Sequence, residues 1–136
     1  MSARYQIDYN DQNVVVFDKE NKYRIDLRER LLEFSVSTIQ FLASIPYKKE
    51  YDVFRYQLSK SASSIGANYE ESQATTVKEF HNKISICVRE ARESHYWLKI
   101  IDRLNLGESE QRHRLLQECE LLTRILGAIK SKVKND

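Results

Sequence analysis

Apolar residues recur every three or four positions in four successive segments, and this spacing constrains the fold more than any other feature of the chain. The period places apolar side chains on one face of a helix, which must then be covered by neighbouring helices. Three Gly and one Pro among 136 residues leave few points where long helices would break. The sequence therefore predicts an all-α fold, an antiparallel up-down-up-down four-helix bundle over residues 23–136.

Local start and stop signals give the expected boundaries. Pro46 ends the first helix, because the residue before a proline disfavours the α conformation. Thr76 and Glu79 form a capping box at the start of the third helix, and Gly107 is a suitable stop after it. The expected helices cover roughly 23–44, 47–73, 76–104 and 108–133. Their seams, which should form the core, are Leu27, Leu31, Phe34, Thr38, Phe41 and Ile45; Phe54, Leu58, Ser61, Ala62, Ile65 and Tyr69; Val77, Phe80, Ile84, Cys87, Ala91, Ser94, Leu98 and Ile101; and Leu115, Cys119, Leu122, Leu126, Ile129 and Val133.

Residues 1–22 do not share the helical period. Residues 10–13 (Asn-Asp-Gln-Asn) are typical of a turn, and the β-branched run that follows at 14–17 favours a strand. A small hairpin is one interpretation, although two isolated strands are marginal on their own. A short extended or disordered arm, lying on the bundle or on a neighbouring subunit, is the other.

The second helix carries an unusual density of small residues between Ser59 and Ala67. Such residues lower helix propensity, and Gly66 alone costs about 1 kcal/mol relative to Ala in a helix interior. Close approach of another helix backbone would explain them. The alternative is a kink near Gly66.

Net charge is +2, from 22 basic and 20 acidic residues, and no segment is strongly one-signed. Bulk charge therefore indicates neither a nucleic-acid nor a membrane partner. Cys87 and Cys119 fall on apolar seams, which favours small buried core residues over a disulfide or a metal pair. No run approaches the roughly 18 apolar residues of a membrane span. We expect a cytoplasmic protein with no membrane partner.

Enzymatic interpretations find little support in the residues. A di-iron bundle needs two Glu-x-x-His motifs, and the chain has one, Glu110 to His113, off the apolar seam. Nucleophilic catalysis needs Ser or Cys beside a positioned base, and the sequence places none there. Arg89 and His95 form an Arg-x5-His pair that resembles the motif of HEPN-type ribonucleases, which cleave RNA at a dimer cleft; Glu90 departs from that pattern. We expect no enzyme, metal or cofactor, with the ribonuclease as the third alternative.

One face of the third helix, opposite the core, forms a continuous polar stripe with five basic residues among eight and no acidic one. Cations at helical spacing with an aromatic ring suit a surface that follows phosphates and stacks a base. The alternative is a solvated outer face, whose field is weakened by the flanking Glu79, Glu90, Glu93 and Asp102. The candidate nucleic-acid-binding residues are Lys78, Arg89, Arg92, Tyr96, Lys99 and Arg103.

A neighbouring stripe gives the third helix more apolar surface than one seam requires. It consists of Ile86, Trp97, Ile100 and Leu104. Either these side chains are surrounded inside the bundle or they meet another subunit. Since Trp is a favoured interface anchor, the stripe favours a homo-oligomer.

Residues 56–71 resemble the motif Gln-Leu-x-Arg-Ser-Ala-x-Ser-Ile-x-x-Asn-Ile-Ala-Glu-Gly of the small bacterial four helix bundle proteins, or 23S rRNA-intervening sequence proteins. This family includes the accessory variability determinant of diversity-generating retroelements. The departures are Lys60 for Arg, Tyr69 for Ile, Glu70 for Ala and Ser72 for Gly. The matching positions are Gln57, Leu58, Ser61, Ala62, Ser64, Ile65, Asn68 and Glu71.

The resemblance implies a cytoplasmic, ring-like homopentamer of four-helix bundles with no known enzymatic activity. Intervening-sequence members are suspected of binding ribosomal RNA, and the retroelement proteins bind nucleic acid and a reverse transcriptase through a basic surface. We interpret Gln57, Asn68 and Glu71 as a buried polar network that fixes helix register, with Ser61 and Ser64 also structural. The sequence thus favours a homo-oligomeric nucleic-acid-binding bundle, with a structural or protein-interaction module as the alternative.

Overall fold

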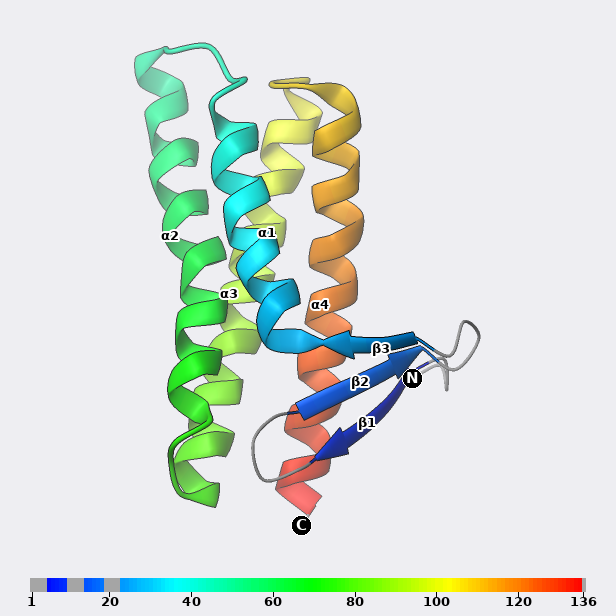
Figure 1. Ribbon diagram of the computed structural model, residues 1–136. Coiled ribbons are helices and arrows are strands. Elements are labelled where there is room, and N and C mark those ends of the chain that lie inside the picture. Colours follow the sequence, from blue (N-terminus) through cyan, green and yellow to red (C-terminus); the bar gives the residue numbers. More distant parts are fainter. Residues whose placement is uncertain (1–4, 10–13, 19–22, 136) are drawn as a thin grey trace.

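The computed structural model describes residues 5–9, 14–18 and 23–135, and its helices lie side by side in alternating directions (Figure 1). The predicted helical bundle is confirmed, with a small sheet ahead of it. The helices are α1 (Leu27–Leu42), α2 (Lys49–Ser72), α3 (Val77–Arg103) and α4 (Ser109–Asn135). The strands are β1 (Tyr5–Tyr9), β2 (Val14–Asp18) and β3 (Tyr23–Asp26).

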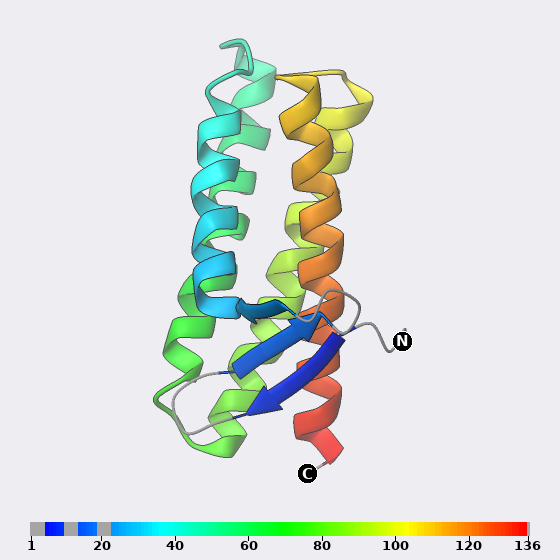
Figure 2. The ribbon, with the colours of Figure 1, turned by 45° about the vertical axis from the view of Figure 1, so that its right-hand side comes forward.

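The sheet is antiparallel in the order β1-β2-β3, and Val16 at its centre pairs with Ile7 and with Ile25. It lies at the N-terminal end of α1 (Figure 2). The sequence predicts helix from Tyr23, and this boundary is wrong, because residues 23–26 pair with β2 as a third strand. A third strand gives β2 backbone partners on both sides, which an isolated hairpin lacks. The turn expected at residues 10–13 lies outside the described residues.

Side-chain caps fix where the helices begin. The carboxylate of Asp26 accepts hydrogen bonds from two backbone N–H groups in the first turn of α1, at 3.1 and 3.5 Å. The Thr76 hydroxyl accepts the N–H of Glu79 at 3.3 Å at the start of α3, as the capping box predicts. Glu108 caps α4 in the same way: its carboxylate accepts hydrogen bonds from the backbone N–H groups of Glu110 and Gln111. These two hydrogen bonds lower the pKa of the Glu108 carboxyl.

The turn between α3 and α4 needs two residues with positive φ, Asn105 at 53° and Gly107 at 75°. Gly107 is also confined by packing, since a Cβ there would lie 2.6 Å from the ring of Phe41. Arg112 in the first turn of α4 is buried and bonds to Asp102 near the end of α3 at 2.7 Å. The turn is therefore held from both of its flanking helices.

Side chains of the four helices meet in one core that follows the predicted seams, with Phe54, Phe80 and Val133 half-buried at its margin. Val77 is wrong as a core residue, because 74% of it is exposed. It opens α3 at the end of the bundle where α2 and α3 extend past the shorter α1 (Figure 1). The seam residues that are buried are Leu27, Leu31, Phe34, Thr38, Phe41, Ile45, Leu58, Ser61, Ala62, Ile65, Tyr69, Ile84, Cys87, Ala91, Ser94, Leu98, Ile101, Leu115, Cys119, Leu122, Leu126 and Ile129.

Small residues bring the backbone of α2 close to both of its neighbours, and α2 runs as one helix through Gly66. On the α1 side, the Ser35 hydroxyl donates to the carbonyl of Ala62 at 3.2 Å. On the α3 side, the Cys87 thiol donates to the carbonyl of Ile65 at 3.4 Å. Such contacts from short side chains require a close approach of the helices, so the close-packing interpretation of this run is confirmed.

Candidate nucleic-acid interface

A hollow of about 440 Å³ lies at the outer edge between α3 and α4. Arg92, Lys99 and Arg124 are exposed there, so their charges are available to a ligand. Arg92, His95 and Lys99 are spaced three and four positions apart, so they share the side of α3 that borders α4. The lining residues are Arg92, His95 and Lys99 of α3, and Glu120, Thr123 and Arg124 of α4.

One carboxylate lines this hollow, and it already has a partner. The Nε2 atom of His95 lies 3.3 Å from a carboxylate oxygen of Glu120, across the α3–α4 boundary. The side chain of His95 is 24% exposed and that of Glu120 is 53% exposed, so the carboxylate stays open to solvent at the hollow. Three exposed cations against one engaged carboxylate leave a local excess of positive charge, although the whole chain carries only +2.

A second hollow, of about 290 Å³, lies beside the first on the outer face of α3. It is lined by Tyr96, Lys99, Ile100 and Arg103, and Lys99 therefore borders both hollows. The Tyr96 side chain is 55% exposed. This hollow combines an aromatic ring and an aliphatic wall with two cations.

The ring of Tyr96 is held in place by an aromatic cluster that reaches α2. It meets Trp97 edge-on, with the ring centroids 5.4 Å apart and the planes at 71°. The Trp97 indole N–H donates to Glu93 at 3.2 Å, and its ring lies 6.5 Å from that of Phe54 on α2. Phe54 in turn stacks on Tyr51 at 6.0 Å. An exposed ring supported by half-buried neighbours loses little freedom when it binds a ligand.

Asp102 and Glu93, two of the four acids that flank the basic stripe of α3, have hydrogen-bond partners within the chain. Asp102 bonds to the buried Arg112, and Glu93 accepts from the Trp97 indole. Burial and the neighbouring Glu93 both raise the pKa of Glu90 above its ordinary value. The Arg112 guanidinium offsets the negative charge of Asp102, whereas Glu93 keeps its charge beside the stripe.

Four of the six predicted binding residues line the two hollows: Arg92, Tyr96, Lys99 and Arg103. Lys78 and Arg89 are exposed but line neither of them. Lys78 lies roughly 31 Å along α3 from Lys99, at 1.5 Å per residue, and Arg89 lies one turn before Arg92. The structure thus concentrates the charge in the C-terminal half of α3.

Arg124 of α4 was missed by sequence reasoning. It lies off the apolar seam of α4 and one turn after Glu120, a spacing typical of any solvated helix face. Its role depends on which side of α4 faces α3. A weak signal was present in the spacing. Glu120 directly follows the seam residue Cys119, and Arg124 lies two positions after the seam residue Leu122.

The structure separates the two residues of the ribonuclease-like pair. Arg89 and His95 lie six positions apart on one helix, which places them about 120° apart around its axis. Arg89 is on the exposed outer face, whereas His95 turns toward α4 and contacts Glu120. The two side chains do not converge on one point in a single chain.

The buried polar network expected among Gln57, Asn68 and Glu71 is wrong. The Asn68 amide donates to the carbonyl of Ser64 in its own helix, and the Glu71 side chain is 61% exposed and pairs with Lys83 of α3. Gln57, Asn68 and Glu71 lie on one side of α2, at its border with α3, where polar side chains reach solvent. Ser64 likewise bonds to a carbonyl of its own helix, at 2.7 Å.

Ser61, the remaining residue of this set, makes the buried polar contact between helices. Its hydroxyl accepts a hydrogen bond from the Ser94 hydroxyl of α3 at 2.8 Å. Both side chains are fully buried, at 1% and 0% exposed. This serine pair and the contact of the Cys87 thiol with the Ile65 carbonyl link α2 and α3 in the core, in place of the predicted amide and carboxylate network.

The second apolar stripe of α3 is largely covered within the chain. Ile86, Trp97 and Ile100 are half-buried, and Trp97 packs against Phe54 of α2, while Leu104 is 49% exposed. A more exposed apolar stripe, which sequence reasoning missed, lies on α1. Its residues are Leu32, Val36 and Ile39, which are 56%, 41% and 51% exposed.

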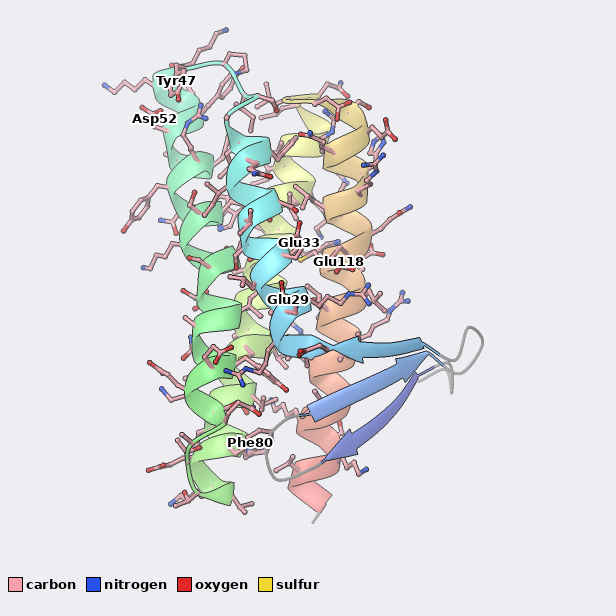
Figure 3. All side chains as sticks on the ribbon, in the orientation of Figure 1. Glu29, Glu33, Tyr47, Asp52, Phe80 and Glu118 are labelled. Carbon is pink, nitrogen blue, oxygen red and sulfur yellow. The ribbon has the colours of Figure 1, made fainter. Side chains whose placement is uncertain are left out.

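A third hollow, of about 270 Å³, lies on the other side of α4, between α1 and α4. Its lining includes the charged residues Glu33, Glu118 and Arg114 and the apolar residues Phe34 and Leu115. Figure 3 shows Glu29, Glu33 and Glu118 together on this face. Arg30 pairs with Glu118 at 2.6 Å. The α1–α4 hollow is lined by two carboxylates and one guanidinium, whereas the α3–α4 hollow is lined by three cations and one carboxylate, so the α3 side of α4 is better suited to anions.

Cys87 and Cys119 are free and buried, as expected for core residues. Burial raises the pKa of each thiol to about 12. Within residues 5–9, 14–18 and 23–135, no three His, Cys, Asp or Glu side chains are grouped as metal ligands. Glu110 pairs with Arg114 on the surface and His113 lies 3.3 Å from Asp102, so the two residues of the single Glu-x-x-His motif have separate partners.

Similarity to known proteins agrees with this architecture. The model of the 23S rRNA-intervening sequence protein family matches residues 24–128, which include all of α1, α2 and α3 and most of α4. The chain belongs to this family. The match begins within β3 and excludes the first two strands, so the four-helix bundle is the part that the 23S rRNA-intervening sequence proteins share.

A solved structure supports the same assignment. The crystal structure of a protein of unknown function from the S23 ribosomal protein family of Bacteroides thetaiotaomicron VPI-5482 is 28% identical to this chain, with a TM-score of 0.69. The match covers 76% of this chain and 97% of that one. No curated protein matches the sequence. Among the helices described, none is long and apolar enough to cross a bilayer.

Proposed function

We propose that this 23S rRNA-intervening sequence protein is a non-enzymatic, self-associating bundle that binds nucleic acid through the α3–α4 hollow. The observation that carries the proposal is the gathering of Arg92, Lys99 and Arg124 from two helices around one hollow. Its single carboxylate, on Glu120, is engaged by His95. A structural or protein-interaction module without nucleic-acid binding is the alternative.

Phosphate is the anion that this arrangement suits. Two guanidinium groups and one ammonium stand at the rim of a polar hollow, and guanidinium groups bind phosphate oxygens in a bidentate manner. Each phosphate that such cations neutralise releases a condensed counterion, which makes binding strongly dependent on salt. Protein–protein contacts between neutral surfaces lack this dependence.

The test is a salt titration of binding to a fluorescently labelled RNA. We expect affinity to fall steeply with salt, and Arg92→Glu, Lys99→Glu and Arg124→Glu each to weaken binding and to reduce the slope. Lys49→Glu is the matched control, an equal charge change at an exposed site on α2 away from both hollows. Equal affinity of all four variants and the parent protein would favour the interaction-module alternative.

Self-association is supported by the exposed apolar stripe of Leu32, Val36 and Ile39 on α1. Family resemblance suggests a ring of five subunits. In sedimentation experiments, we expect Leu32→Asp and Ile39→Asp to lower the particle mass to that of a monomer, whereas Leu104→Asp, at the C-cap of α3, leaves it unchanged. A monomeric parent protein would disprove self-association.

The non-enzymatic part of the proposal is supported by the separation of Arg89 from His95 around α3. RNA incubated with the purified protein should stay intact at every salt concentration of the binding assay. Cleavage that Arg89→Ala and His95→Ala both abolish would instead establish the ribonuclease.

A further inference from the structure

We infer that the ligand is a single-stranded nucleic acid, with a base stacked on Tyr96 and the adjoining phosphates on the cations that flank this ring. The inference rests on the proposed function and specifies which form of nucleic acid the surface takes. It follows from the placement of one exposed aromatic ring between two hollows that share Lys99.

The hollow beside Tyr96 has the chemistry of a nucleotide site. The ring of Tyr96 and the side chain of Ile100 are apolar walls, and Lys99 and Arg103 are cations at its rim. Arg92, one turn before Tyr96, belongs to the adjoining α3–α4 hollow. Cations therefore lie on both sides of the ring along the helix, where the phosphates before and after a stacked base would pass.

The ring of Tyr96 is supported by its neighbours and still exposed. Trp97 meets it edge-on at 5.4 Å, and Trp97 is itself fixed by Glu93 and Phe54. More than half of Tyr96 stays open to solvent. A base can stack on such a supported ring at small entropic cost, and every base has a face that can do so.

A duplex cannot use this ring. Tyr96 projects from the convex outer face of a helix, and the bases of a duplex are stacked inside it, out of reach of a ring that does not enter a groove. A single strand can splay its bases outward onto an aromatic side chain while its backbone follows the cations. The pairing of Tyr96 with Lys99 and Arg103 therefore favours single strands.

Other exposed tyrosines provide internal controls. Tyr56 on α2 is 64% exposed and lines neither of the two α3 hollows. Tyr47 is 82% exposed, but the guanidinium of Arg55 lies 4.4 Å over its ring and occupies that face. Tyr56 is thus an exposed tyrosine outside both hollows, with Lys60 one turn after it on α2.

The experiment compares one RNA of about 12 nucleotides, within the site sizes of single-strand binders, as a single strand and as a blunt duplex. We expect the parent protein to prefer the single strand, and Tyr96→Ala to weaken that complex by roughly 5- to 150-fold, the loss of one base stack. Tyr96→Phe, which keeps the ring, and Tyr56→Ala should bind like the parent. Duplex affinity and the salt slope should not change with Tyr96→Ala, because no charge is removed.

Two results would overturn the inference, and they are distinct from failure of the proposed function. If Lys99→Glu abolishes binding while Tyr96→Ala leaves it intact, the cations bind nucleic acid without a stacked base. If the duplex binds the parent as tightly as the single strand, the preference is wrong. Should the parent bind neither form, the proposed function and the inference fail together. Circular dichroism of Tyr96→Ala checks that the exposed substitution leaves the bundle folded.

Discussion

The hydroxyl of Ser94 on α3 donates a hydrogen bond to the hydroxyl of Ser61 on α2 at 2.8 Å, and both side chains are buried in the core. Ser94 also lies 2.9 Å from the carbonyl of Glu90 in its own helix, and Ser61 lies 3.4 Å from that of Leu58. Each hydroxyl therefore keeps a local partner if the other is removed. The pair lets two helices approach closely without leaving a buried polar group unsatisfied.

Two substitutions at Ser61 separate hydrogen bonding from close approach. We expect Ser61→Ala to lower the free energy of unfolding by about 1 kcal/mol, because one ordinary hydrogen bond is lost and Ser94 keeps its partner. Ser61→Leu should lower it by about 3 kcal/mol, because the larger side chain must separate α2 from α3. Urea unfolding measures both. A Leu variant as stable as the Ala variant would show that the helices have room to spare.

Three glycines should respond to alanine in opposite directions. Gly107→Ala should destabilise by about 2 kcal/mol or more, because its φ is 75° and its Cβ would lie 2.6 Å from the Phe41 ring. At Gly66, a Cβ would meet Leu31 at 3.6 Å, an ordinary contact, and at Gly127 it would meet nothing within 4 Å. Both lie inside helices, so alanine there should stabilise by about 0.5–1 kcal/mol. Thermal unfolding of the three variants would show the sign of each change.

Arg112 should be the most important ion-pairing residue for stability. It is 5% exposed, bonds to Asp102 at 2.7 Å and donates to the carbonyl of Leu106 at 2.8 Å. Arg112→Ala should lower the free energy of unfolding by about 3 kcal/mol, because buried acceptors lose their donor. The matched control is Arg114→Ala, where an exposed pair with Glu110 should contribute only about 0.2–1 kcal/mol. Similar effects of the two variants, measured by urea unfolding, would contradict the structure of the α3–α4 turn.

The buried thiols predict a loss of stability at alkaline pH. Burial raises the pKa of Cys87 and of Cys119 from 9.0 to about 12. Above the unfolded pKa, the unfolded chain loses these protons while the folded chain keeps them, so stability falls as pH rises through this window. Below the unfolded pKa the contribution is fully present.

The measurement is the free energy of unfolding in urea at a series of pH values between the unfolded and folded pKa. Lysines and tyrosines also titrate there, so the Cys87→Ala and Cys119→Ala variants are compared with the parent in the same buffers. Each variant should show a shallower alkaline decline than the parent. Parallel declines would mean that the thiols ionise equally in both states. Modification by thiol reagents at neutral pH should likewise be limited by unfolding.

Helix boundaries and core residues could be predicted because they depend on local chemistry. Pro46 cannot continue a helix, Thr76 caps one, and a side chain such as Leu98 falls on the buried face by spacing alone. The errors occurred where contacts with other elements decide the burial or the secondary structure of a residue. Val77 has the right spacing but lies beyond the end of α1, and residues 23–26, which the predicted first helix includes, pair with β2 as a strand.

The sequence by itself determined that four amphipathic helices form and which face of each is buried, since periodicity is a property of one helix at a time. Only the tertiary structure decided which outer residues meet across helices. It joined Arg124 to Arg92 and Lys99. It also brought His95 into contact with Glu120 across the α3–α4 boundary. The physical reason is that the rotation of each helix against its neighbours is set by packing of the whole core, and this rotation fixes which surface side chains share a hollow.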